Sequence, residues 1–145
     1  MPKTISEIIQ KKKKKKKITV VTSYDYTMAT LCDQVDILLV GDSAGMVMLG
    51  YENTVPVTMD QMCMFTEGVS NGRKNALIVA DLPNKSYENE VDAVANSQRL
   101  INAGADAVKL EGRLPEIIKA IIKAGIPVMG PVSYTHLTLP TTPYV

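Results

Sequence analysis

Val35-Asp36-Ile37-Leu38-Leu39-Val40-Gly41-Asp42-Ser43 is an apolar run that ends in a glycine, a carboxylate and a hydroxyl. The aliphatic residues between Val35 and Val40 are typical of a strand that is buried on both faces, as in a parallel sheet flanked by helices. Asp42 would then lie at the carboxyl end of that strand. The stretch therefore predicts an α/β protein with an acidic side chain at the rim of its sheet.

The same pattern returns twice further along the chain. The apolar residues 76–80 are followed by Asp81, and residues 105–110 are followed by Glu111. The three acids lie 39 and 30 residues apart, and each interval is about the length of one βα unit. Because parallel strands end at one rim, we expect Asp42, Asp81 and Glu111 to converge there.

Helices are expected between these strands, with capping residues and glycines at their ends. Thr4 and Glu7 form a capping-box pattern, which predicts a short N-terminal helix that closes the bottom of the domain. Residues 44–53 are glycine-flanked and lack periodicity, so we expect a loop over the rim. The remaining order is βαβαβαβαβ, with strands at 18–25, 35–40, 76–81, 105–110 and 126–130, and helices at 26–33, 58–71, 90–103 and from Pro115 to just before Gly125.

The composition is that of an ordinary globular protein. The chain has 145 residues, 46% of them hydrophobic and 21% charged, with no apolar run long enough to span a bilayer and no signal-peptide pattern. We therefore expect a cytoplasmic protein in which Cys32 and Cys63 are reduced. A complete (β/α)8 barrel needs about 250 residues, so the chain is either a smaller α/β domain or a fragment.

A run of lysines from Lys11 to Lys17 makes the charge distribution uneven. The net charge is +1, so without these seven lysines the rest of the chain sums to 1 − 7 = −6. A basic segment can bind nucleic acid or an anionic membrane, but a lysine run without arginine or aromatic residues is more typical of a solvated, mobile connector. We expect neither a nucleic-acid nor a membrane partner.

The last fifteen residues differ in character from the rest. Residues 131–145 contain three prolines, no charged residue and no glycine, and do not continue the βα pattern. We expect residues 1–130 to be the N-terminal half of a barrel domain and residues 131–145 to be a divergent tail. That tail is either foreign to the parent gene, such as translated adaptor sequence, or a natural proline-rich ending.

Carboxylates gathered at a rim suit a hard divalent ion such as Mg²⁺, which takes oxygen ligands and keeps waters or substrate oxygens in its other positions. Asp42 and Asp81 are the candidate ligands, and Ser43 offers a backbone N–H and a hydroxyl to a substrate carboxylate. Lys109 and Glu111 are two residues apart on one strand and share a side of it. Equally compatible with the sequence is a structural role, in which Asp42 and Asp81 cap the helices that follow them.

Several motifs resemble those of the ketopantoate hydroxymethyltransferase family, in the same order from about residue 3 to residue 130. They are Ser23-Tyr24-Asp25-Tyr26, Leu39-Val40-Gly41-Asp42-Ser43-Ala44-Gly45-Met46, residues 50–58, Ala80-Asp81-Leu82-Pro83, residues 104–112 and residues 125–130. The resemblance implies a (β/α)8 TIM barrel of the phosphoenolpyruvate/pyruvate group, here truncated to about its first five strands. It also implies a homo-oligomeric, cytosolic enzyme of pantothenate and coenzyme A biosynthesis.

The implied reaction transfers a hydroxymethyl group from 5,10-methylenetetrahydrofolate to the 2-oxo acid 3-methyl-2-oxobutanoate, giving ketopantoate. By position, Asp42 and Asp81 match the family's Mg²⁺ ligands and Glu111 matches a third acid near the metal. Ser43, Asp81 and Lys109 match contacts to the keto acid, and Lys109 would offset anionic charge in the reaction. The expected partners are thus a small 2-oxo acid and a folate.

The chain also departs from the family pattern. Pro131 stands where the family has a substrate-contacting histidine, and the family's general base, a glutamate from a later strand, has no counterpart. Phe65 replaces a common histidine, residues 84–85 are polar where apolar residues are usual, and His136 lies in the divergent tail. We therefore predict half of an active site, inactive alone. The alternatives are another Mg²⁺-dependent lyase or mutase of 2-oxo acids, or a non-catalytic fragment.

Overall fold

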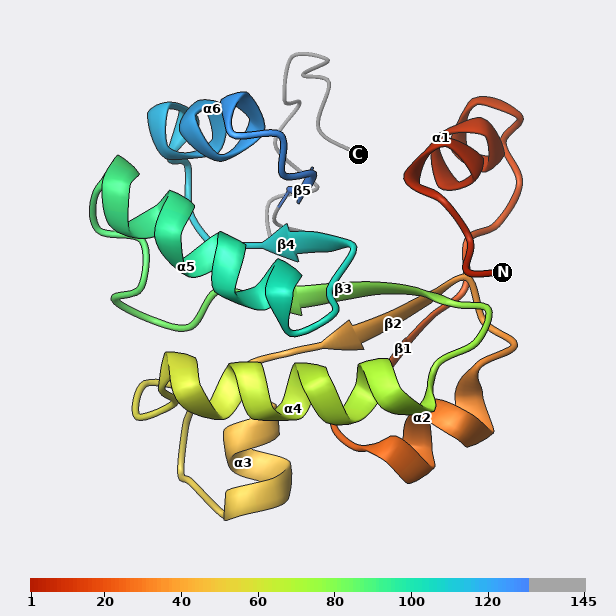
Figure 1. Cartoon of the computed structure of the whole chain (residues 1–145), viewed down its shortest axis with the longest axis horizontal. Coiled ribbons are helices and arrows are strands. Elements are labelled where there is room, and N and C mark those ends of the chain that lie inside the picture. The colour runs from red at the N-terminus through yellow and green to blue at the C-terminus, as the bar shows by residue number, and fades with distance from the viewer. Residues whose placement is uncertain (131–145) are drawn as a thin grey trace.

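A computed structural model describes residues 1–130 as a five-stranded parallel sheet with helices packed against it (Figure 1). The strands are β1 (Val20–Thr22), β2 (Ile37–Val40), β3 (Leu77–Asp81), β4 (Ala107–Lys109) and β5 (Val128–Met129). The helices are α1 (Ile5–Lys13), α2 (Tyr26–Cys32), α3 (Ala44–Leu49), α4 (Met59–Gly72), α5 (Glu90–Asn102) and α6 (Pro115–Lys123). The tail 131–145, with Pro131 and His136, lies outside the described residues.

The strands pair in their order along the chain, β1-β2-β3-β4-β5, as successive βα units require. This confirms the five expected strands and their parallel arrangement. The sheet is open, because within residues 1–130 β1 pairs only with β2 and β5 only with β4. Because all the strands are parallel, their carboxyl ends lie along one rim.

Alternate strand residues face the two sides of the sheet. One side, which includes Leu38, Ile78 and Val108, is buried in the main core against the helices that follow the strands. The other side, which includes Ile37 and Leu77, packs instead against α1. Figure 1 shows α1 apart from α4, α5 and α6, across the sheet from them.

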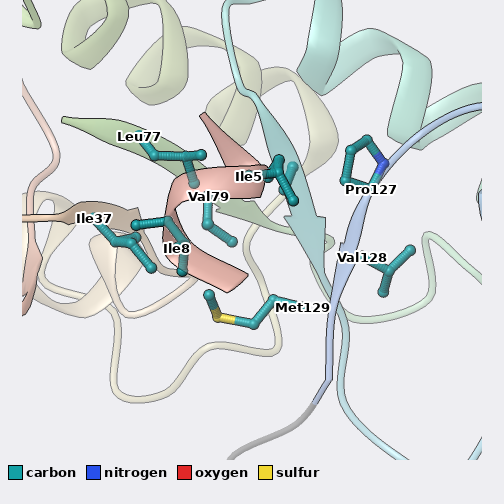
Figure 2. A pocket seen from close by; sticks show the side chains of 9 residues that line it. Ile5, Ile8, Ile37, Leu77, Val79, Pro127, Val128 and Met129 are labelled. Carbon is teal, nitrogen blue, oxygen red and sulfur yellow. The ribbon is translucent and has the colours of Figure 1, made fainter. Parts of the chain in front are cut away.

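Helix α1 closes the amino-terminal end of the sheet, as expected. Its capping box is present, because Thr4 and Glu7 each bond the other's backbone N–H. Ile5 and Ile8 point toward Ile37 of β2 and toward Leu77 and Val79 of β3 (Figure 2). Ile8 is only 3% exposed. The cavity left between them is apolar and about 10 Å³, room for one water at most. The side chains of α1 therefore fill this end of the sheet, and the remaining cavity is too small for a ligand.

Three buried or half-buried aspartates tie neighbouring βα units together at this amino-terminal rim. Their carboxylates accept hydrogen bonds from backbone N–H groups of a neighbouring unit, which would otherwise be left unpaired where the ladder begins. Asp33 accepts from Lys74, Asn75 and Ala76, Asp36 accepts from Thr19, and Asp106 accepts from Ile78. These side chains are structural, and they lie at the opposite rim from Asp42 and Asp81.

The prediction of a mobile lysine connector is wrong for the start of the lysine run. Lys11 to Lys13 form the last turn of α1, where positive charge is favourable next to the carboxyl end of the helix dipole. Lys11 also forms an ion pair of 2.5 Å with buried Asp36. The sequence pattern missed this contact because the partner lies 25 residues away.

The prediction of a loop over residues 44–53 is also wrong for residues 44–49, which form α3, whereas residues 50–53 are irregular. Gly45 allows α3 to pack closely against Val57, because a Cβ there would lie 2.3 Å from Val57 Cγ2. Gly50, at φ 72°, ends the helix. The sequence shows no alternation of apolar and polar residues at helical spacing here, because the four consecutive apolar residues 46–49 are all exposed.

Cys32 and Cys63 are free thiols, as expected. Among residues 1–130, no helix combines the length and the apolar character that crossing a membrane requires.

Gly104→Ala is expected to destabilise the fold by about 2–4 kcal/mol, because a new side chain there meets both strain and a clash. Gly104 lies between α5 and β4 at φ 107°, and a Cβ would sit 2.1 Å from Ser70 Oγ. Gly125 is the matched control: it occupies the same kind of turn before β5 at φ 84°, with open space around it. Gly125→Ala should cost only about 1 kcal/mol in urea unfolding. Equal losses for the two variants would contradict the clash.

Candidate active site

The candidate site lies at the carboxyl ends of β2, β3 and β4, where the sequence placed it. Asp81 ends β3 and is in direct register with Lys109, which ends β4. Asp42 follows β2, and its backbone N–H donates to Asp81 Oδ2 over 3.2 Å. The structure thus brings Asp42, Asp81 and Lys109 together.

Lys109 is buried, 8% exposed, between two carboxylates. Its Nζ lies 3.4 Å from Asp81 Oδ1 and donates to Glu111 Oε1 over 2.6 Å. Burial alone acts to lower the pKa of Lys109, but the charges of Asp81 and Glu111 outweigh it and hold that pKa above its ordinary value. Lys109 is therefore a fixed positive charge at the rim.

Asp81 is buried as well, and burial raises the pKa of its carboxyl to about 6, although Lys109 and the Asp42 N–H act in the opposite direction. Its Oδ1 is fully buried and forms an ion pair of 3.4 Å with Lys109 Nζ, which is long for a charge-assisted hydrogen bond of about 2.7–2.9 Å, and it has no well-formed hydrogen bond within residues 1–130. A buried acceptor that is only weakly paired is costly. A carboxylate oxygen is also the kind of ligand that a hard divalent cation takes.

Asp42 is half-buried, and burial likewise raises its pKa, against the opposing effects of Lys109 and of a hydrogen bond from the Thr54 side chain. Neither Asp42 nor Asp81 caps a helix. The residue before α3 is Ser43, whose side chain makes no capping bond, and α5 is capped by Asn89. The capping alternative is therefore wrong for both aspartates.

The donor set fits a small divalent cation held by two carboxylates, with its remaining positions left to water or substrate oxygens. Gly41 keeps room beside it, because a Cβ there would lie 3.5 Å from Asp81 Oδ2 and 3.1 Å from Ser43 Oγ. Glu111 is directed to Lys109 instead. Among residues 1–130, no three His, Cys, Asp or Glu side chains group in a metal-binding arrangement.

Sequence reasoning missed three side chains at this rim. The Tyr24 hydroxyl and Ser43 Oγ are 2.6 Å apart, and Thr54 bonds Asp42. Tyr87 is half-buried close to the charges of Glu111, Asp42 and Lys109. Burial raises its pKa, while a hydrogen bond that its oxygen accepts from the Glu111 backbone N–H opposes that rise. All three lie in connecting segments, where no periodic pattern predicts direction. The available signals were the polar end of the first strand at residues 23–25 and the family-like motifs at residues 23–26 and 50–58, which contain Tyr24 and Thr54.

The fold is shared with solved α/β barrels. The chain superposes on a phosphonopyruvate hydrolase, solved as a complex with oxalate and Mg²⁺, with a TM-score of 0.72 at 14% identity, covering 88% of this chain and 52% of that one. It superposes on a 2,3-dimethylmalate lyase, a PEP mutase/isocitrate lyase superfamily member, with a TM-score of 0.66 at 15% identity, covering 92% and 54%. The chain thus has the fold of five successive strands of a TIM barrel.

Sequence similarity identifies the family within that class. The family model described as ketopantoate hydroxymethyltransferase matches residues 2–140, and the chain belongs to this family. It is 64% identical over 135 residues to the 3-methyl-2-oxobutanoate hydroxymethyltransferase of Nitrosopumilus maritimus, covering 90% of this chain and 48% of that protein. The chain spans about half the length of the curated relatives it matches.

Proposed function

We propose that Asp42, Ser43, Asp81, Lys109 and Glu111 form the metal- and 2-oxo-acid-binding half of a hydroxymethyltransferase active site. The reaction is transfer of a one-carbon unit from 5,10-methylenetetrahydrofolate to 3-methyl-2-oxobutanoate, giving ketopantoate. The observation that carries the proposal is the buried, weakly paired Oδ1 of Asp81 beside Asp42 and Lys109. Family membership supplies the choice of substrates.

In this proposal Asp42 and Asp81 hold Mg²⁺, with Glu111 the nearest further acid. When bound, Mg²⁺ supplies Lewis-acid polarisation of the substrate's keto oxygen. Ser43 binds the substrate carboxylate through its backbone N–H and hydroxyl. Lys109, held by Glu111, offsets the negative charge that develops on the substrate as the C3 proton leaves. The resulting nucleophilic carbon would then form a bond to the methylene carbon of the folate. Both carbon–nitrogen bonds of that methylene would break, water would supply the hydroxyl oxygen of ketopantoate, and tetrahydrofolate would leave.

Removal of the C3 proton requires a base, and we assign none among residues 1–130. In the family pattern that base is a glutamate from a later strand, beyond the segment matched here. We therefore propose that this chain binds the metal and the 2-oxo acid but does not turn them over. The proposal also places the protein in the cytoplasm and in a homo-oligomer. Free thiols and exposed apolar side chains such as Val47, 66% exposed, are compatible with both.

Calorimetry should detect binding of 3-methyl-2-oxobutanoate only with Mg²⁺ present and none after chelation with EDTA. Asp81→Asn should weaken that binding by about tenfold or more, because it removes a charged ligand oxygen. The control is Asp60→Asn on α4, whose side chain is 89% exposed and pairs with Arg99.

Metal-independent binding, or equal weakening by Asp60→Asn and Asp81→Asn, would contradict the site. Folate-dependent ketopantoate formation at the rate of a full-length relative would contradict the missing base. Folate-independent cleavage of a 2-oxo acid would instead favour a lyase.

A further inference from the structure

Tyr24 contacts the proposed substrate site through a single short hydrogen bond. Its hydroxyl oxygen lies 2.6 Å from Ser43 Oγ, and its half-buried ring packs against the main core. The side chain of Ser43 makes no capping bond to α3. Tyr24 is therefore the group that sets the direction of the Ser43 hydroxyl.

The backbone around Tyr24 is fixed on both sides. The Ser23 N–H donates to the Leu39 carbonyl over 3.0 Å, which extends the β1–β2 pairing by one bond. Asp25 caps α2 by accepting from the Met28 N–H over 2.8 Å. Tyr24 is held between a strand end and a helix start, so its hydroxyl is a preorganised partner for Ser43.

We propose that Tyr24 is a positioning residue of the 2-oxo-acid site, which orients the Ser43 hydroxyl toward the substrate carboxylate. The inference rests on the proposed function of Ser43. In the free chain either hydroxyl can donate. A bound carboxylate can only accept, so Ser43 must donate its single proton to the substrate. Tyr24 must then donate to Ser43 Oγ. The result is a directed chain from Tyr24 through Ser43 to the carboxylate, in which each bond strengthens the next.

The test measures the Kd for 3-methyl-2-oxobutanoate with Mg²⁺ in the 145-residue chain and in four variants: Tyr24→Phe, Ser43→Ala, the double variant and Tyr51→Phe. Tyr24→Phe should raise the Kd about tenfold, and the double variant should bind no more weakly than Ser43→Ala alone, because the two hydroxyls act as one unit. Tyr51→Phe is the matched control, since it removes a tyrosine hydroxyl that bonds Gln61 over 2.7 Å. It should leave the Kd unchanged.

The outcomes separate the inference from the function beneath it. A wild-type chain that does not bind the 2-oxo acid would overturn both. Weakening by Ser43→Ala but not by Tyr24→Phe would overturn only the positioning role. So would additive losses in the double variant, or a Tyr24→Phe variant whose unfolding midpoint falls while its Kd stays constant.

A second measurement needs no substitution and covers the case in which Tyr24→Phe does not fold. In the unsubstituted chain, the hydroxyl proton shared over 2.6 Å should exchange slowly with water and be visible by proton NMR. Addition of Mg²⁺ and the 2-oxo acid should leave the Tyr24 proton protected, because Tyr24 is the donor in the bound state. Loss of that protection on binding would contradict the proposal.

Discussion

Lys109→Met is expected to weaken Mg²⁺-dependent binding of 3-methyl-2-oxobutanoate on the order of a hundredfold, since removing one partner of a buried charged pair costs about 2–5 kcal/mol. Lys109 is 8% exposed and lies within 3.4 Å of Asp81 and 2.6 Å of Glu111. Without it, the carboxylates of Asp42, Asp81 and Glu111 and an anionic substrate would meet at the rim with only the proposed metal to offset their charge. Calorimetric titration of the variant measures the loss.

The chain offers a control for the removal of a lysine charge. Lys119 on α6 pairs with Glu116 over 3.0 Å, but its side chain is 64% exposed. Lys119→Met should therefore leave the Kd unchanged, because exposed ion pairs contribute little.

The same substitution should also alter the titration of Asp81. Lys109 is the main group that opposes the effect of burial, so the pKa of Asp81 should rise above about 6 in Lys109→Met. NMR titration of the carboxyl carbons checks the direction. An unchanged Kd in Lys109→Met, together with this rise, would show that the lysine tunes Asp81 without contacting the substrate.

The strands and the three acids at their ends could be predicted because each strand is a local, continuous apolar run with its own terminator. The exact register does not follow from parallel pairing alone, because the strand-end pattern aligns Asp81 with Glu111, whereas the structure places Asp81 opposite Lys109. Parallel pairing itself is a general property of βα repeats. The placement of the site residues at the ends of the strands could therefore be predicted from the sequence.

Contacts between distant segments could not be predicted in the same way. Tyr24 meets Ser43 only because the loop after β1 turns across the end of β2. Lys11 meets Asp36 only because α1 packs under the sheet. Helix α3 was missed because its apolar residues face outward, which removed the periodic signal. In each of these three instances, packing between segments that are distant in the sequence determined the structure, and the local residue pattern did not.

The two rims of the sheet use carboxylates in opposite ways, and pKa values record the difference. At the carboxyl rim, burial without enough donors raises the pKa of Asp81 to about 6. At the amino rim, Asp36 is as deeply buried, and burial alone would raise its pKa too. Bonds from Lys11 and Thr19 outweigh that effect and lower the pKa to about 2. The first arrangement leaves a carboxylate oxygen available for a ligand, whereas the second stabilises the fold.

Asp36→Asn is accordingly expected to lower the free energy of unfolding at pH 7 by about 2 kcal/mol, which is the linkage value for a shift of nearly two pKa units. Asp36 is 3% exposed and accepts from Lys11 Nζ over 2.5 Å and from the Thr19 N–H over 2.9 Å. Because its pKa is lowered in the folded state, the ionised form favours folding. This stabilisation is complete above the unfolded pKa of about 4 and disappears as the pH falls through about 2.

Urea unfolding of both proteins between pH 7 and pH 2 tests this sign. The difference between wild type and Asp36→Asn should be constant down to about pH 4 and then shrink toward pH 2, because protonation removes from the wild type what the substitution has already removed. Asp60→Asn, at an exposed ion pair, should stay within about 0.5 kcal/mol of wild type throughout. A difference that persists at pH 2 would mean that the shape of the side chain at position 36, and not its charge, holds α1 under the sheet.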